Sequence, residues 1–348
     1  AGHAAGQLVV SLKQQNYDGG IVLVGDEPYL PYQRPPLSKK FLAGAMEAER
    51  LFVKPASFYD DAGIELRLET EIAAIDRERK CLRSGSGDEI PYDKLVLALG
   101  SRARLLPVEG AKLKCIHYLR SIADVDGIRE DFQSGRRLVV VGAGYIGLEV
   151  AAVAQQAGLD VTVIEMANRV MSRVVSPEIS DFYQIEHTNQ GVKFRLSTGV
   201  SGFNGKKRVK SVTTSEGEEI PTDLVVIGVG IQPNTEHATA AALDVDNGIV
   251  VDDHCRTGDP DIYAVGDAPH TRTRSTTGGC DWSPCTMRSN RPRQLLRISA
   301  ARIRAMRKSP GSGRTSMTSS CRLPGSPRVT TASLSVGIRP NGRFPVST

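Results

Sequence analysis

The sequence predicts an α/β fold with mainly parallel sheets, and two observations support this fold class. First, short apolar runs typical of buried strands occur at 21–24, 93–101, 138–141 and 161–164, with helix-like segments between several of them. Second, glycine-rich turns lie at the start of two of these helix-like segments. Alternating strands and helices are typical of βαβ units, whose crossovers are right-handed. With 348 residues, the chain has room for two or three domains.

The strongest motif lies in the middle of the chain. An apolar run leads into Gly-Ala-Gly-Tyr-Ile-Gly at 142–147, a helix-like segment follows, and a second apolar run ends at Glu165. In such a unit Gly142 permits a tight turn, Gly144 lets the backbone approach a pyrophosphate, and Gly147 lets helix and strand pack closely. The helix N-terminus offers unpaired N–H groups to the phosphates. Glu165 can accept both ribose hydroxyls and would repel a 2′-phosphate, so the unit predicts NAD(H) rather than NADP(H).

The first residues are similar to the second half of another such turn. Gly2, His3 and Ala4 precede a helix-like segment, and the apolar run at 21–24 ends shortly before Asp26. If a strand ending in glycine came before residue 1, the opening would be a GxGxxA fingerprint that lacks roughly ten residues. Asp26 would then face a second adenosine ribose. The alternative is an ordinary N-terminal helix with small residues.

Three later segments support two nucleotide sites. The strand-like run at 93–101 ends at a glycine turn, and the run at 223–234 repeats this pattern. The run at 261–267 ends at Asp267, whose carboxylate can accept hydrogen bonds from a ribityl chain. We therefore expect one nucleotide to be a prosthetic group and the other to be exchanged.

The composition is typical of a globular protein without membrane spans. Hydrophobic residues make up 40% and charged residues 24%. No apolar run reaches the roughly 18 residues of a membrane span, and the start lacks the basic region and apolar core of a signal peptide. The six cysteines have no disulfide-framework spacing, which predicts a cytoplasmic protein. The six histidines show no ligand spacing, so no metal site is predicted.

Residues 280–348 differ from the rest of the chain. They contain 13 Lys or Arg residues and one acidic residue, Asp281, in a chain whose formal net charge is +5. Helix and strand periodicity is lost, so we expect an aberrant, disordered tail. Cys280 and Cys285 have CxxxxC spacing, but no strand or helix precedes them, and no redox pair is predicted. A tail that binds nucleic acid and a shifted reading frame are the two explanations to weigh.

Residues 31–44 give the most specific resemblance. The sequence Pro-Tyr-Gln-Arg-Pro-Pro-Leu-Ser-Lys at 31–39 is followed by Leu-Ala-Gly at 42–44. Together with the motifs above, it resembles the FAD-dependent ferredoxin reductases of bacterial oxygenase systems, over residues 1–279. The related disulfide reductases carry a CxxxxC pair here, whereas this chain has no cysteine before Cys81. The resemblance implies an enzyme that passes electrons from NADH through FAD directly to a [2Fe–2S] ferredoxin of a P450 or aromatic-ring oxygenase.

The resemblance also implies site residues and two Rossmann-like domains. FAD would be bound by Gly2, Ala4, Asp26, Arg34, Lys39, Ile72, Arg120 and Asp267. NADH would be bound by Gly142, Gly144, Tyr145, Ile146, Gly147, Glu149, Glu165 and Gly230, with Pro233 shaping the crevice beside Gly230. Lys39 and Glu149 would lie near the flavin and the nicotinamide, and no side chain would be catalytic because the flavin does the chemistry. Leu99 departs from the threonine often found in this family's Ala-Thr-Gly turn.

The expected FAD-binding domain is discontinuous, comprising residues 1–104 and 232–279. The NADH-binding domain, 105–231, is inserted into it, and 280–348 is the aberrant tail. One constant shift of reading frame, with permitted codons, changes residues 280–296 and 306–325 into segments similar to the family's C-terminal region. We therefore expect a frameshifted tail, no nucleic-acid partner, and a C-terminal interface domain that is missing or scrambled.

Three alternatives remain at this stage. An NADH oxidase-like flavoprotein would need a redox cysteine near the flavin, which residues 31–44 lack. A nucleic-acid-binding protein would need a genuine basic tail whose binding depends on salt. A degenerate, non-functional reductase fragment would hold FAD poorly and reduce ferredoxin slowly.

Overall fold

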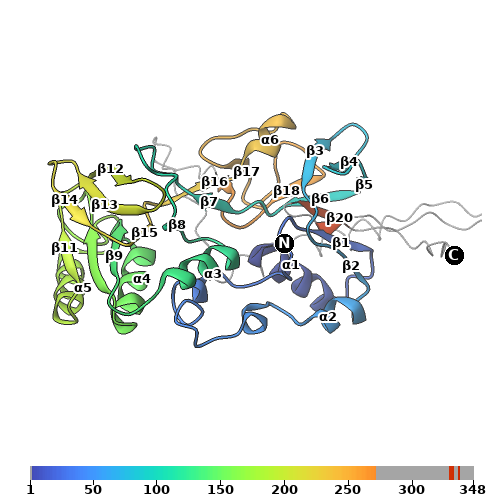
Figure 1. Ribbon diagram of the computed structural model, residues 1–348. Coiled ribbons are helices and arrows are strands. Elements are labelled where there is room, and N and C mark those ends of the chain that lie inside the picture. Colours follow the sequence, from blue (N-terminus) through green and yellow to red (C-terminus); the bar gives the residue numbers. More distant parts are fainter. Residues whose placement is uncertain (1, 272–328, 333–335, 338–348) are drawn as a thin grey trace, which may run out of the picture. The chain divides into compact units, whose positions relative to one another are not determined.

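The computed structural model describes residues 2–271, 329–332 and 336–337, which form two compact units (Figure 1). The first unit contains the described residues of 1–33, 52–101 and 233–348. The second contains 34–51 and 102–232. The sequence placed 34–51 in the same domain as the rest of 1–104, but this segment groups with the second unit because it packs on two of that unit's helices.

The first unit is built on a parallel sheet in the order β18-β6-β20-β1-β2, with β21 pairing antiparallel to β1. Its elements are α1 (His3–Gln14), β1 (Ile21–Val24), α2 (Ala56–Asp61), β2 (Ile64–Arg67), β3 (Ile72–Asp76), β4 (Cys81–Ser84), β5 (Glu89–Pro91), β6 (Lys94–Leu97), α6 (Glu236–Ala240), β17 (Ile249–Val251), β18 (Ile262–Ala264), β19 (Pro269–Thr271), β20 (Val329–Ala332) and β21 (Val336–Gly337).

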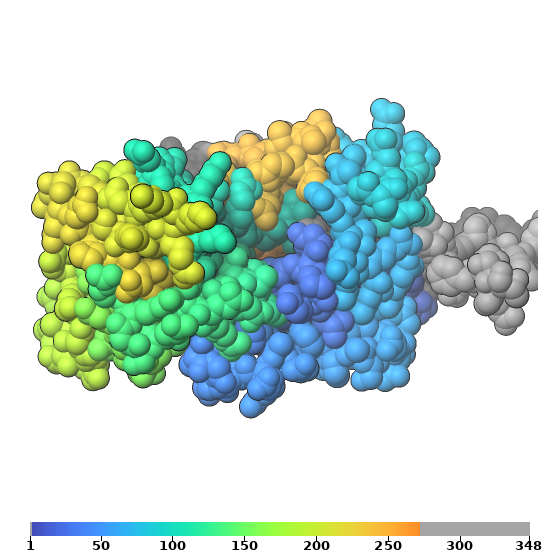
Figure 2. Space-filling view, in the orientation of Figure 1, coloured from blue at the N-terminus to red at the C-terminus, as the bar shows by residue number. Residues whose placement is uncertain are grey.

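Both faces of this sheet are covered, which explains why β1 is apolar throughout. Ile21 and Leu23 point to one face and pack with Val9 of α1, because side chains of a strand alternate between faces. Val22 and Val24 point to the other face and join the core under β3, β4 and β5. The outer side of this three-stranded sheet lies on the molecular surface (Figure 2).

The central place between β1 and β6 is taken by β20. Its residues 329–331 pair with Ile21–Leu23 of β1, and residues 329–332 pair with 94–97 of β6, both parallel. No strand was expected in this region, whereas the structure describes β20 and β21 there. The other predictions for the tail, including the shifted frame and the Cys280–Cys285 spacing, lie outside the described residues.

The second unit contains a parallel sheet in the order β11-β10-β9-β15-β8 and an antiparallel sheet in the order β12-β13-β14. Its elements are the 3₁₀ helices η1 (Pro35–Ser38) and η2 (Ala48–Leu51), β8 (Ile116–Tyr118), α3 (Ile122–Asp131), β9 (Arg137–Val141), α4 (Tyr145–Gln156), β10 (Asp160–Ile164), α5 (Pro177–Asn189), β11 (Lys193–Arg195), β12 (Val200–Gly205), β13 (Val209–Thr214), β14 (Glu219–Pro221) and β15 (Leu224–Ile227). β7 (Ser101–Ala103) and β16 (Ile231–Pro233) lie where the chain passes between the units.

The predicted strand–turn–helix–strand motif is confirmed in this unit. β9 and β10 pair in parallel over 137–141 and 160–164, with α4 between them along the chain. α4 begins at Tyr145, within the glycine-rich turn at 142–147, and its N-terminus therefore faces the end of the sheet where the turn lies. Within the described part of the chain, the helices are too short or too polar to cross a membrane.

Candidate nucleotide-binding sites

The turn at 142–147 combines two closely packed glycines with one open glycine. A Cβ at Gly142, which has a φ of +100°, would lie 2.6 Å from the carbonyl oxygen of Gly228. A Cβ at Gly147 would lie 1.9 Å from the carbonyl oxygen of Gly142. Nothing lies within 4 Å of a Cβ built at Gly144. Gly142 and Gly147 therefore serve backbone packing, and Gly144 leaves space for a ligand.

The turn also presents donors and an aligned helix. Gly144 is the N-cap of α4 and offers no side-chain cap, so the N–H groups of the first turn are available to an anion. Tyr145 and Ile146, the first two residues of α4, are exposed. These features fit the pyrophosphate of a dinucleotide.

Glu165 is held against this turn from the end of β10. Its Oε2 accepts from the backbone N–H of Ala143 at 2.7 Å, and its Oε1 accepts from that of Ala167 at 2.8 Å. A carboxylate has about four acceptor positions, so each oxygen can still accept a ribose hydroxyl. The contact with Ala143 joins Glu165 to the glycine-rich turn, and the sequence alone did not predict this contact.

Lys39 and Glu149 are brought together in the second unit. Lys39 Nζ lies 2.7 Å from Glu149 Oε2, and the hydroxyl of Ser38 donates to the same oxygen at 2.5 Å. Arg34 donates through Nη1 to the carbonyl oxygen of Arg120 at 2.5 Å. The sequence assigned Arg34, Lys39 and Arg120 to FAD and Glu149 to NADH, and the structure places all four in one unit. Sequence reasoning did not identify Ser38, although Ser38 stands next to Lys39 in the motif at 31–39.

Gly230 lies at the end of the second unit's chain. Its φ is +110°, and nothing lies within 4 Å of a Cβ built there. Its carbonyl oxygen accepts from the backbone N–H of Arg104 at 3.0 Å. This open, left-handed position fits a backbone that a ligand approaches closely.

In the first unit, the start of α1 meets the end of β18. Gly2 is the N-cap of α1, and nothing lies within 4 Å of a Cβ built there. A Cβ at Gly266, whose φ is +86°, would lie 3.1 Å from Cβ of Ala4. Asp267 accepts from the hydroxyl of Ser101 at 3.0 Å. Burial lowers the pKa of His3, and the charge of Asp267 opposes that shift.

These contacts place Ala4 of α1 beside Gly266, which precedes Asp267, and this arrangement fits a second nucleotide. Asp26 is exposed just after β1, where a carboxylate is accessible to a ligand. Ile72 is only 5% exposed and belongs to the core with Leu82 and Ile90, so its side chain has a packing role in addition to any contact with a nucleotide. Ser101 was missed by sequence reasoning, since a serine after a glycine turn carries no distinctive signal.

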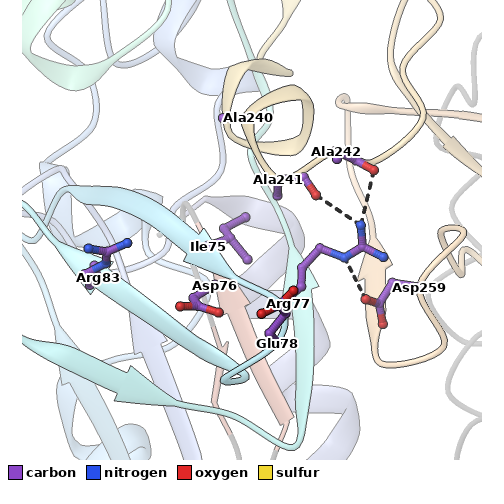
Figure 3. A pocket seen from close by; sticks show the side chains of 9 residues that line it. All are labelled: Ile75, Asp76, Arg77, Glu78, Arg83, Ala240, Ala241, Ala242 and Asp259. Atoms are coloured by element: carbon purple, nitrogen blue, oxygen red, sulfur yellow. Dashed lines mark hydrogen bonds and ion pairs between the residues drawn. The ribbon is translucent and has the colours of Figure 1, made fainter.

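A hollow of about 640 Å³ in the first unit lies away from these residues (Figure 3). Arg77 spans it, donating through Nε to Asp259 at 2.9 Å and through Nη1 to the carbonyl oxygens of Ala241 and Ala242, both at 3.2 Å. The guanidinium thus joins β3 to the end of α6 and the loop before β18. None of the predicted site residues lines this hollow, and its contacts are structural.

Among the described residues, Asp252, Asp253 and His254 could place ligand atoms within 4.8 Å of one another. Asp252 already accepts from the backbone N–H groups of His254 and Arg256 and pairs with the Arg256 guanidinium at 3.1 Å. These contacts form a local turn, and we assign no metal to it.

The comparisons with known proteins agree with this geometry. The family described as "Pyridine nucleotide-disulphide oxidoreductase" matches residues 1–281. Rhodocoxin reductase of Rhodococcus erythropolis is 46% identical over 268 residues, which cover 77% of this chain and 63% of that protein. Putidaredoxin reductase CamA of Pseudomonas putida is 43% identical over 272 residues, which cover 76% and 64% respectively. The chain thus spans less than two thirds of the length of these two relatives.

Two solved structures of ferredoxin reductases are similar. The reductase for the CYP199A2 system from Rhodopseudomonas palustris is 40% identical, with a TM-score of 0.80 over 87% of this chain and 74% of that one. The covalent putidaredoxin reductase–putidaredoxin complex is 37% identical, with a TM-score of 0.81 over 94% of this chain and 76% of that one. The fold, the glycine-rich turn and the matched range together place this chain in the pyridine nucleotide-disulphide oxidoreductase family.

Proposed function

We propose that this chain carries the two nucleotide-binding units of an NADH-dependent ferredoxin reductase that uses FAD. The observation that carries the proposal is the turn at 142–147, where open Gly144 and the helix N-terminus lie beside the fixed carboxylate of Glu165. The names of the relatives support the acceptor, since several are called ferredoxin reductases. The [2Fe–2S] ferredoxin is therefore the proposed partner, and nucleic acid is not.

The second unit would hold NADH. The N–H groups at the start of α4 bind the pyrophosphate, and Glu165 accepts the ribose hydroxyls and repels a 2′-phosphate. Tyr145, Glu149 and Gly230 would lie toward the nicotinamide.

The first unit would hold FAD, through Gly2, Ala4 and the N-terminus of α1 at the pyrophosphate and Asp267 at the ribityl chain. Bound FAD would supply the chemistry, accepting a hydride from NADH and giving up electrons one at a time. The protein would position the two nucleotides. A cytoplasmic location is also proposed, supported by Cys81, Cys115 and Cys255, which are buried free thiols.

The carrier could also be a rubredoxin, because a rubredoxin-NAD(+) reductase of Pseudomonas putida is 43% identical over 275 residues. We favour a ferredoxin because two similar structures belong to ferredoxin systems. Presenting both carriers to the same preparation distinguishes them.

The test uses the full chain mixed with FAD and freed of excess flavin. Anaerobic NADH should bleach the flavin absorbance, NADPH should do so far more slowly, and a [2Fe–2S] ferredoxin should then be reduced. The oxygen reaction is measured separately, because fast oxygen consumption without ferredoxin reduction would favour an oxidase. A chain that retains no FAD, or that uses NADPH equally well, would contradict the proposal.

A further inference from the structure

Ser38 holds the carboxylate of Glu149 from a buried position. Ser38 is 4% exposed and ends the 3₁₀ helix η1, which begins with two prolines and packs on α3 and α4. Its hydroxyl donates to Oε2 of Glu149 at 2.5 Å. Because proline fixes its backbone angle, the helix that carries Ser38 has little freedom to move.

Lys39 by itself would orient the carboxylate of Glu149 less firmly than Ser38 does. Its ammonium reaches the same oxygen at 2.7 Å, but its side chain is 48% exposed and also donates to the carbonyl oxygen of Pro35 at 3.1 Å. An exposed ion pair between flexible side chains contributes little energy and holds its geometry loosely. The charge-assisted hydrogen bond from the buried Ser38 therefore fixes the direction of the carboxylate.

Two further contacts hold the segment that contains Ser38, one on each side of this residue. Arg34 donates to the carbonyl oxygen of Arg120, before α3. Arg129 of α3 donates to the carbonyl oxygen of Phe41, and its guanidinium lies 4.3 Å from the centre of the Phe41 ring. Residues 34–41 are thus attached on one side of Ser38 to Arg120 and on the other side to Arg129 of α3, so the donor is held in place.

We propose that Ser38 is a positioning residue for the nicotinamide end of the dinucleotide and acts through Glu149. Glu149 follows the N-cap of α4 by five residues, about 7.5 Å along the helix at 1.5 Å per residue. Glu165, at the end of β10, marks the adenosine end of the same site. A carboxylate fixed by Ser38 can then orient the nicotinamide half while leaving the adenosine half unaffected. This inference rests on the proposed binding of NADH by the second unit.

The test compares two ligands on the full chain by titration calorimetry. ADP-ribose has the adenosine half and the pyrophosphate but no nicotinamide, whereas NADH has all three. Ser38→Ala should weaken NADH binding about tenfold, the scale of one hydrogen bond to a charged group, and leave ADP-ribose binding unchanged. Ser38→Thr, which keeps the hydroxyl, should restore most of the NADH affinity.

Two further variants separate positioning from general damage. In a Glu149→Ala background, Ser38→Ala should cause no further loss, because two residues that act as one unit are not additive. Ser180→Ala removes another buried hydroxyl, which donates from α5 to the carbonyl oxygen of Val170, and should change neither ligand's affinity. Equal weakening of ADP-ribose and NADH by Ser38→Ala, or no change in either, would overturn the inference.

The same titrations distinguish this inference from the proposed function. If the unmodified chain binds neither ADP-ribose nor NADH, the proposed function fails, and the role of Ser38 fails with it. If the unmodified chain binds both ligands and Ser38→Ala binds NADH equally well, only the role of Ser38 is overturned.

Discussion

At the residue scale, the glycines of the 142–147 turn separate structural from ligand-facing positions. A methyl group at Gly147 would lie 1.9 Å from a backbone oxygen, whereas Gly144 faces open space. Gly144 also has a φ of −79°, which any residue can adopt. The same residue type is therefore required for two different reasons within four positions.

Exchanging each of these glycines for alanine should give opposite results. Gly144→Ala should retain the melting temperature and lose at least about tenfold in NADH affinity, because the methyl group occupies the path of the pyrophosphate. Gly147→Ala should lower the free energy of unfolding by about 2 kcal/mol or more, since overpacking forces the backbone apart. Thermal unfolding and NADH titration of both variants provide the check, and loss of stability in Gly144→Ala would contradict this assignment.

Asp223 gives the second unit a pH-dependent contribution to stability. Its carboxylate accepts three hydrogen bonds from Arg137, through the backbone N–H and the guanidinium, at 2.8–3.1 Å. The bonds from the Arg137 side chain are the main reason that the pKa of Asp223 falls from 3.8 to about 2. A pKa that is lower in the folded state stabilises the fold above 3.8 and loses that effect as the pH falls toward 2.

Asp223→Asn should therefore destabilise the chain near neutral pH and have less effect in acid. The side chain is 36% exposed, so the loss should be no more than about 1 kcal/mol. Urea unfolding at pH 7 and at pH 3 measures the difference between variant and unmodified chain. A difference that stays the same at both pH values would show that the charge of Asp223 is not the cause.

At the element scale, the segment 34–51 is organised by the helices on which it packs. The segment itself forms the short helix η1 at Pro35–Ser38 and local turns after it, in which Phe41 donates to the carbonyl oxygen of Pro36 and Ala43 donates to that of Lys39. Its fixed points come from α3 and α4, which lie about 90 to 110 residues later in the sequence. α3 itself is defined locally by a capping box, in which Ser121 accepts from the Asp124 N–H and Asp124 accepts from the Ser121 N–H.

Arg129→Ala should loosen this segment without changing the cleavage sites within it. Trypsin should then cut faster after Lys40 and Arg50, because the bond to Phe41 and the ring contact are both lost. Arg195→Ala, which removes a surface ion pair with Glu218, is the matched control and should leave the cleavage rate unchanged. Equal rates in Arg129→Ala and the unmodified chain would contradict the role of Arg129.

At the scale of the whole molecule, the sheet of the first unit depends on a strand far along the sequence. β20 pairs on one side with β1 and on the other with β6, more than 230 residues earlier. Without a strand there, both neighbours would present unpaired backbone groups in the middle of the sheet. The integrity of the first unit is therefore predicted to depend on residues 329–332.

Thr331→Pro tests this dependence, because proline removes a ladder N–H and is excluded from central strands. The variant should lose about 3 kcal/mol or more in free energy of unfolding, so it should unfold at a lower urea concentration. It should also aggregate. Thr331→Val, which keeps strand propensity, should behave as the unmodified chain does. A Thr331→Pro variant of unchanged stability would show that β20 is dispensable.

Much of the fold follows from local sequence. The apolar runs at 21–24, 138–141 and 161–164 become β1, β9 and β10, because a strand buried on both faces must be apolar throughout. The glycines at 142 and 147 predicted the geometry of the turn at 142–147, since a positive φ or a closely packed backbone favours glycine. The resemblance to known reductases followed from residues 31–44 together with this turn and the other motifs.

Only the tertiary structure decided which distant residues meet. The sequence of this protein contains two motifs typical of nucleotide binding and determines their order. Through Glu165, it also predicts a preference for NADH over NADPH. It did not determine that Ser38 and Lys39 share an oxygen of Glu149, or that β20 lies between β1 and β6. Local periodicity and turn chemistry depend on neighbours within a few residues, whereas these contacts depend on chain segments brought together by the burial of apolar surface.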